Sequence, residues 1–308
     1  MLNTEYVMPI ITADRLPTYE FFIYDHSIRL ITDIGALIEY IKSHYINNPA
    51  VKTKKTITIT LLRNAQIYKY MRQEMLARGG KTQSKDYFES VFNLKNRSWL
   101  GLIFEAQQTI GYYALFQNIF KTFLKIDGFA FLHASCWTWR EHCVIATGPS
   151  GYGKTTLLIS AAVNGLKIIS DSHTMIGKRG RNAISVTFPY IEGLRQSNGN
   201  AGVPELLDTD IWANYHTPSL LIFLEKTSGW NLSWQPITKP EAAIKLLTPK
   251  GGPFAMEIND HRAVKKLFNR LNDLAFQVKS GVLTIGSENM KKEFSERGSL
   301  WKDLQKII

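Results

Sequence analysis

The spacing of apolar residues predicts a chain built from short strands and amphipathic helices. Residues 56–60 alternate apolar and polar side chains, which is typical of a half-buried strand. Apolar residues from 34 to 41 recur every three or four positions, which predicts an amphipathic helix that ends near Tyr45. Further helices are predicted over about 110–125, 241–247 and 264–278 and in the basic tail from Met290.

Short apolar runs predict the remaining strands. From residue 129 onward these runs follow one another closely and alternate with helices, which is typical of α/β domains. They lie at 21–24, 129–133, 143–147, 166–170, 220–224 and 281–285, with a hairpin at 174–177 and 184–188. Residues 1–18 and 80–100 show no readable periodicity. Residues 193–204, rich in Gly and Asn, are predicted to form a loop.

A glycine-rich segment, GPSGYGKTT at 148–156, joins an apolar run to a helical pattern that begins at Lys154. Strand, glycine turn, Lys-Thr and helix in this order match the phosphate-binding loop G-x-x-x-x-G-K-[ST]. Glycines let backbone N–H groups turn inward on an anion, and the helix adds the positive end of its dipole. Lys154 is predicted to reach the outer phosphates of a nucleotide, and the Thr155 hydroxyl to bind Mg²⁺. The predicted nucleotide-binding residues are Gly148, Ser150, Gly151, Tyr152, Gly153, Lys154, Thr155 and Thr156.

Polar residues at the ends of two neighbouring strands are candidates for the chemistry. Asp171 follows the strand 166–170, where a carboxylate can hold Mg²⁺ or accept a proton from an attacking hydroxyl. A turn or capping aspartate is the alternative. His133 ends the predicted strand 129–133, which comes before the strand of the phosphate-binding loop, and it either contacts phosphate or substrate or packs in the core. The same two interpretations apply to His173.

Composition and charge narrow the class of protein. The chain has 308 residues and a net charge of +11, and no apolar run approaches the roughly 20 residues that span a bilayer. The first ten residues lack the basic and apolar regions of a signal peptide, and Cys136 and Cys143 fit neither a zinc site nor a redox pair. These features predict a cytoplasmic protein that does not associate with a membrane. The charge favours anionic partners, but basic and aromatic residues do not interleave, so nucleic acid is not the expected partner.

Four stretches together resemble the HPr kinase/phosphorylase-like family, which shares its nucleotide-binding core with phosphoenolpyruvate carboxykinase. They are LHAS at 132–135, GPSGYGKTTL at 148–157, LKIISD at 166–171 and FPYIEGLR at 188–195. With the strand and helix pattern, the resemblance implies an α/β protein of two domains. An α+β module at 1–124, a candidate for acceptor recognition, precedes a kinase-like P-loop core with a mixed sheet at 125–308.

The family transfers the γ-phosphoryl group of ATP to a hydroxyl, usually that of a protein serine. Similar proteins include kinases of ribosomally made peptides, such as lasso precursors. The resemblance therefore implies a kinase that uses ATP, or another nucleoside triphosphate, together with Mg²⁺. It also implies a peptide or protein acceptor that carries a hydroxyl, and assembly into homo-oligomers.

The resemblance also assigns roles to single residues. These are Lys154 as the phosphate lysine, Thr155 as the metal-binding hydroxyl, Asp171 as the first of a pair of acids that serve as base and metal ligand, His133 as the histidine of a His-Gly or His-Ala element, and Arg195 as a basic residue near the acceptor. One departure matters, because the family has Asp-Asp where this chain has Asp171 and Ser172. His173 and Glu192 are candidates for the missing role.

Three alternatives stay open at this point. The missing second acid favours a nucleotide-binding switch or scaffold without kinase activity. A kinase of a small-molecule hydroxyl has the same sequence features as a peptide kinase. The net charge of +11 motivates an NTPase linked to nucleic acid, whose affinity for nucleic acid would fall steeply with salt.

Overall fold

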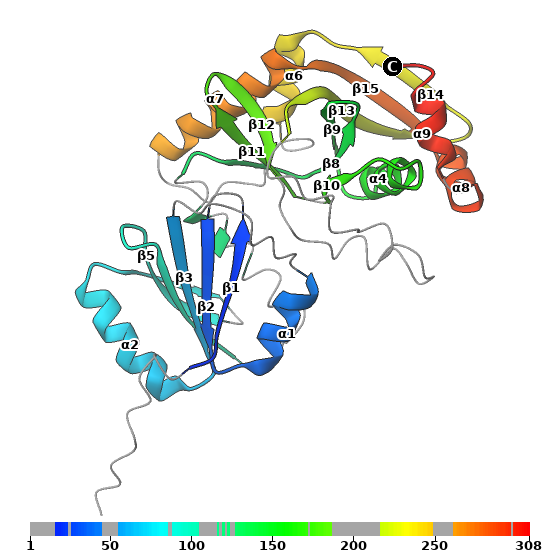
Figure 1. The fold of residues 1–308 in the computed structure, drawn as a ribbon. Helices are drawn as coiled ribbons and strands as arrows, with labels where there is room; N and C mark the ends of the chain where they lie inside the picture. The colour runs from blue at the N-terminus through cyan, green and yellow to red at the C-terminus, as the bar shows by residue number, and fades with distance from the viewer. Residues whose placement is uncertain are drawn as a thin grey trace, which may run out of the picture. The chain divides into compact units, whose positions relative to one another are not determined.

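The computed structural model resolves two compact units, which are drawn as ribbons in Figure 1. One unit comprises Met1–Ser43 and Lys52–Phe123, and the other comprises His44–Val51 and Leu124–Ile308. The residues that the structure describes are 16–23, 26–44, 55–85, 88–104, 116, 119–120, 122–123, 127–171, 173–186, 216–248, 261–296 and 298–308. Both units combine helices with mixed sheets, so the predicted mixed α/β class is confirmed.

The first unit contains a six-stranded mixed sheet in the order β1-β2-β3-β6-β5-β4. Strands β2, β3 and β6 are parallel, and β1, β5 and β4 pair antiparallel to their neighbours. The strands are β1 (Thr18–Ile23), β2 (His26–Thr32), β3 (Lys55–Leu62), β4 (Lys81–Lys85), β5 (Phe88–Asn93) and β6 (Ser98–Ile103). The helices are α1 (Gly35–His44) and α2 (Ala65–Ala77). The sequence predicted β3 and α1 but neither α2 nor the hairpins of residues 81–103.

Local physical chemistry accounts for α2, which the apolar pattern did not reveal. Asn64 caps this helix, because its side-chain oxygen accepts hydrogen bonds from the backbone N–H groups of Gln66 and Ile67. Most of the helix is exposed, and Tyr68 is its only fully buried side chain among those described. Tyr68 packs with Leu62 and Leu100 of the sheet. Ile67, Met71 and Met75 of the same helix are only partly buried against this cluster, so the apolar face of α2 is weak in the sequence.

The predicted helix at 110–125 lies largely outside the described residues. The apolar positions that motivated it, Phe116, Ile119, Phe120 and Phe123, are helical and fully buried. Phe120 makes an edge contact with Phe21 of β1, with 6.0 Å between ring centroids. The apolar face of this segment therefore covers the sheet of the first unit.

The second unit is organised around a sheet in the order β10-β8-β9-β13-β15-β14, with a smaller sheet β12-β11-β7 beside it. The strands are β7 (Ala130–Leu132), β8 (Ala134–Trp139), β9 (His142–Thr147), β10 (Ile168–Ser170), β11 (Thr174–Arg179), β12 (Asn182–Val186), β13 (Pro218–Thr227), β14 (Leu232–Pro236) and β15 (Lys279–Gly286). β9, β13 and β15 are parallel, and β10 runs in the same direction because β8 pairs antiparallel to both β9 and β10. The carboxyl ends of these four strands therefore share one edge, where open α/β sheets bind ligands.

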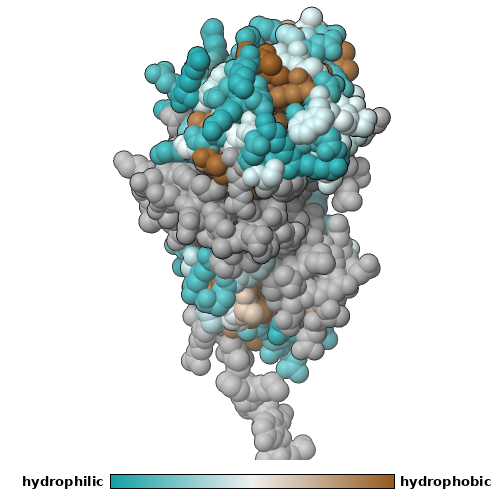
Figure 2. Space-filling model, turned by 90° about the vertical axis from the view of Figure 1, so that its right-hand side faces the viewer, coloured by the Kyte–Doolittle hydropathy of each residue, from teal (hydrophilic) through white to brown (hydrophobic). Residues whose placement is uncertain are grey.

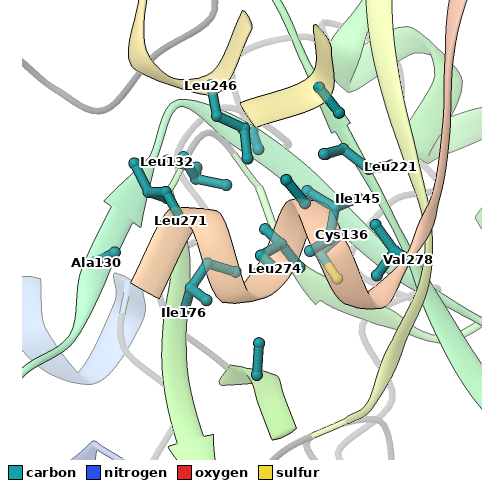
Figure 3. Packing of buried hydrophobic residues seen from close by; sticks show 14 of the residues in the cluster. Ala130, Leu132, Cys136, Ile145, Ile176, Leu221, Leu246, Leu271, Leu274 and Val278 are labelled. Carbon is teal, nitrogen blue, oxygen red and sulfur yellow. The ribbon is translucent and has the colours of Figure 1, made fainter. Parts of the chain in front are cut away.

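Helices cover both faces of this sheet (Figure 1). They are α4 (Lys154–Val163), α6 (Lys239–Leu247), α7 (His261–Gln277), α8 (Ser287–Ser295) and α9 (Ser299–Leu304). α4 and α9 share a core with β8 and β9, which includes the edge-to-face pair Trp137 and Trp301. On the opposite face, α6 and α7 pack on Ile145 and Leu221, and Figure 3 shows Leu271 and Leu274 pointing into this cluster.

Several predicted boundaries in this unit were wrong. The apolar run at 129–133 is β7 alone, and a separate strand, β8, begins immediately after His133 and pairs with β9. His133 therefore lies between β7 and β8, and the strand directly before β9 is β8 and not the run at 129–133. The tail that was predicted to be helical from Met290 is helical, but it forms two helices, α8 and α9, and begins at Ser287. The edge strand β14 was not predicted.

Two predictions from composition can be compared directly with the structure. Cys136 and Cys143 are free and buried, and Cys136 Sγ lies 3.3 Å from Ser185 Oγ. Burial, followed by contact with Cys136, raises the pKa of the Cys143 thiol, so this thiol stays protonated and behaves as a small apolar side chain. No helix in the described part of the chain is long and apolar enough to cross a membrane.

Candidate functional site

The turn between β9 and α4 has the backbone that its glycines allow. Gly151 and Gly153 have φ angles of +78° and +91°, in the left-handed region that L side chains rarely adopt. Gly153 is the N-cap of α4 and supplies no side chain to cap the first N–H groups of the helix. These donors and the positive end of the helix dipole make the turn suited to an oxyanion.

Lys154 is folded back over this turn. It is 6% exposed, and its Nζ donates hydrogen bonds of 2.9 Å to the carbonyl oxygens of Gly148 and Pro149. Burial lowers the pKa of Lys154 to about 8, although the carboxylate of Asp171 acts in the opposite direction. The ammonium group is therefore held beside the turn, in a setting where an added negative charge would favour its protonated form.

Asp171 lies directly after β10 and is 2% exposed. Its Oδ1 accepts a hydrogen bond of 3.0 Å from Ser135 Oγ and one of 3.1 Å from Thr155 Oγ1. Ser135 comes from β8 and Thr155 from the first turn of α4, so three elements converge on one carboxylate oxygen. The structure thus brings together the acid and the hydroxyl that the sequence predicted as partners.

Thr155 lines a hollow of about 460 Å³, and Asp171, to which Thr155 is hydrogen-bonded, is not among the lining residues. The lining combines predicted site residues with four that the sequence reasoning missed. The predicted ones are His133, Ser150, Gly151, Gly153, Lys154, Thr155 and Thr156. The missed ones are Lys226, Ser287, Met290 and Lys291. Lys226 could have been found as a cation near the carboxyl end of the buried strand β13, whereas the residues of α8 carry no motif.

Gly148 and Tyr152 lie elsewhere. They line a second hollow of about 440 Å³, together with Phe223, Lys226 and Lys245. Gly148 also has a structural role, because a Cβ added there would come 3.1 Å from the backbone oxygen and Cβ of Leu224. The predicted loop residues therefore face two hollows, which share Lys226.

The other predicted residues do not take part in the hollow as described. His173 is buried, and its backbone N–H donates a 2.7 Å hydrogen bond to the carbonyl oxygen of Asp171, which closes the turn after β10. Arg195, Ser172 and Glu192 lie outside the described residues. The predicted loop at 193–204 lies outside them as well.

The donor groups of the site suit a hard cation. Thr155 offers a hydroxyl oxygen and Asp171 a carboxylate, and Mg²⁺ typically takes one or two such protein ligands and completes its shell with water and phosphate oxygens. Among the described residues, no group of three or more His, Cys, Asp or Glu side chains is placed to hold a metal by itself. The described residues therefore fit a magnesium ion that arrives with phosphate.

Comparison with known proteins gives matches among solved structures but none among family models or curated sequences. No protein-family model matches the chain, and no curated protein sequence matches it. Among solved structures, the HPr(Ser) kinase/phosphatase from Coxiella burnetii matches with a TM-score of 0.32 and 14% sequence identity. The match covers 57% of this chain and 95% of the other. A match at this level carries no weight for function, which has to come from the residues of the site.

Proposed function

We propose that the second unit has an HPr kinase-like P-loop core, binds ATP with Mg²⁺ and transfers the γ-phosphoryl group to a hydroxyl of a peptide or protein. The observation that carries the proposal is the convergence of Thr155 and Ser135 on Asp171, beside a glycine turn that holds a buried lysine. A phosphate cradle alone indicates a nucleotide. A carboxylate fixed at its edge adds a group that can take a proton.

The turn, Lys154, Thr155 and the nearby Asp171 each have a part in this chemistry. The N–H groups of the turn and Lys154 bind the β- and γ-phosphate oxygens, which fixes the phosphorus atom for in-line attack. Thr155 and Asp171 would hold Mg²⁺, which neutralises phosphate charge when it is bound. The acceptor oxygen forms a bond to the γ-phosphorus while the bond from phosphorus to the β,γ-bridging oxygen breaks. The acceptor proton passes to the carboxylate of Asp171, and ADP leaves.

His133 lines the same hollow, at the amino end of β8. At that position its imidazole can donate a hydrogen bond to a phosphate oxygen or to the acceptor. Arg195, predicted from the resemblance alone, would counter charge near the acceptor.

The test is phosphoryl transfer from γ-labelled ATP to candidate acceptor peptides and proteins, with the labelled residue located by mass spectrometry. Asp171→Asn and Lys154→Ala should each lower the rate by about 100-fold or more while the fold is kept. Asp273→Asn, which alters a surface carboxylate of α7, is the matched control and should keep full activity. Full activity in either site variant would contradict the proposal, and label in a small metabolite would favour a small-molecule kinase.

A nucleotide-binding switch is the second candidate function. It is favoured by the residue after Asp171, which is Ser172 where the family has a second acid. Under this alternative, ATP binds tightly and Lys154→Ala abolishes binding, but no acceptor becomes labelled in any screen.

A further inference from the structure

A third hollow, of about 390 Å³, lies along α8. The two hollows share Lys291, which lines both. The remaining lining residues of the third hollow are Trp230, Glu288, Lys292, Ser295 and Glu296. Figure 2 views the side of the molecule that faces right in Figure 1, where α8 and α9 lie, and hydrophilic residues predominate there around a few hydrophobic ones.

Trp230 differs from the other side chains of this hollow. It is 68% exposed, as much as any large hydrophobic side chain described in the chain, and it lies in the turn between β13 and β14. The six-membered and five-membered rings of an indole offer a flat apolar face that a purine or pyrimidine can cover. Base stacking on such a side chain is worth about 1–3 kcal/mol.

The turn that carries Trp230 is fixed to the start of α8. Gly286 N–H donates to the carbonyl oxygen of Asn231, and Glu288 N–H donates to that of Gly229 over 3.1 Å. The approach is so close that a Cβ on Gly286 would lie 2.1 Å from the oxygen of Gly229. Gly229 itself has a φ of +73°, which favours glycine. Trp230 is therefore held on a rigid turn and is not a side chain of a loose loop.

α8 is in turn fixed to the helix that follows the glycine turn. The carboxylate of Glu293, 3% exposed, accepts hydrogen bonds from Ser160 Oγ of α4 at 2.9 Å and from the backbone N–H groups of Gly298 and Leu300 at 2.6 and 2.7 Å. Met290, also in α8, closely approaches Gly153 at the start of α4. The phosphate-binding turn, α8 and the Trp230 turn thus form one connected unit at the carboxyl edge of β9, β13 and β15.

The second hollow is a less suitable place for a base. Two aromatic side chains line it. Tyr152 is partly buried and packs on the core cluster around Trp137. Phe223 is 5% exposed, and Lys245 lies over the ring with 5.9 Å between Nζ and the ring centroid. Lys245 also pairs with Glu225 at 3.4 Å. The ring face of Phe223 is therefore already covered, whereas the side chain of Trp230 is mostly open to solvent.

We propose that Trp230 is the stacking platform for the base of the nucleotide whose phosphates bind at Lys154, and that Lys291 lies along the path between base and phosphates. This inference rests on the proposed nucleotide binding and adds the position of the base. Lys291 is paired with Glu288 at 2.7 Å, and its side chain is 71% exposed.

The experiment compares ATP with inorganic tripolyphosphate, which has the phosphates but no base, by titration calorimetry on the full chain. Trp230→Ala should weaken ATP binding by about tenfold and leave tripolyphosphate binding within about twofold. Trp230→Phe keeps a ring and should retain most of the ATP affinity. Lys154→Ala should weaken both ligands. Tyr70→Ala, which removes an equally exposed aromatic side chain of the first unit, is the matched control and should change neither.

The outcomes separate this inference from the proposed function. Equal effects of Trp230→Ala on both ligands, or an effect on neither, would overturn the stacking assignment. Wild-type protein that binds tripolyphosphate as tightly as ATP would overturn it as well, and so would protein that binds neither. A selective loss of ATP binding in Trp230→Ala, with no phosphoryl transfer to any acceptor, would support the base subsite and contradict the kinase. Loss of ATP binding only on Lys245→Ala would place the base in the second hollow.

Discussion

The hydroxyl of Thr155 donates a hydrogen bond to Asp171 Oδ1 over 3.1 Å, although the two residues belong to different elements. Thr155 lies in the first turn of α4, and Asp171 follows β10, which is separated from β9 in the sheet by β8. The contact joins the phosphate-binding turn to the acid that would act on the acceptor. Any change that moves this carboxylate should therefore affect transfer more than nucleotide binding.

Ser135 is the residue that tests this relationship most directly. Ser135→Ala removes the 3.0 Å hydrogen bond to Asp171 Oδ1 without touching the turn, so we expect kcat to fall by about tenfold with little change in KM for ATP. Ser185→Ala is the matched control, because it removes another fully buried serine hydroxyl of the same unit, one that contacts Cys136. A rise in KM with kcat unchanged would show that Ser135 serves nucleotide binding instead.

Nucleotide binding should take up protons near pH 8. Burial lowers the pKa of Lys154 to about 8, so much of this side chain is neutral in the free protein above that pH. Phosphate beside the amine favours the charged form, so binding raises this pKa and draws up to one proton from solution. Calorimetry of ATP binding in two buffers of different ionisation enthalpy at about pH 8.5 measures the uptake.

Lys154→Arg is the control for this proton uptake, because its guanidinium stays charged and should show none. Proton release on binding to the wild type would contradict the prediction.

The lowered pKa of Lys154 also affects the stability of the fold. Because the folded pKa lies below the unfolded value of 10.5, the charged lysine destabilises the fold at neutral pH, and this penalty decreases as pH rises from about 8 to 10.5.

Gly153→Ala should damage the site in two separable ways. Its φ of +91° strains any L residue, and the new Cβ would come 2.8 Å from Met290 Cε. Gly165→Ala is the matched control, because Gly165 has a φ of +80° with nothing within 4 Å of the added Cβ. We expect Gly165→Ala to cost about 1 kcal/mol in unfolding free energy and Gly153→Ala about 1 kcal/mol more. Adding Met290→Ala should recover much of that excess, and no recovery would show that the contact is not limiting.

Glu293 should be essential for the attachment of α8 and α9 to α4. Glu293→Ala leaves Ser160 and the N–H groups of Gly298 and Leu300 without their buried acceptor, so we expect a loss of about 2–4 kcal/mol in unfolding free energy. Urea denaturation followed by far-UV circular dichroism measures this loss. Glu296→Ala, an exposed acid just beyond the same helix, should change stability by less than about 0.5 kcal/mol. Similar small effects for both variants would contradict the role of Glu293.

The phosphate-binding turn could be predicted from sequence because its determinants are local. Gly151, Gly153 and Lys154 occupy fixed positions in one short segment, and the backbone angles that they need follow from residue type. Strongly periodic elements, such as β3 and α7, could also be predicted from the sequence. α2 and β14 could not be predicted in this way. Few of their side chains are buried, and a pattern of apolar residues reveals only elements that bury one face.

The sequence alone determined the glycine turn, its lysine and hydroxyl, and the acid after the following strand, because each depends on neighbours a few residues away. Tertiary structure alone decided that Ser135 contacts Asp171, that Glu293 fastens α8 to α4, and that Trp230 lies on the same edge as Lys154. Those contacts join residues up to 133 positions apart. They depend on strand order and on the packing of helices against the sheet, which no local spacing encodes.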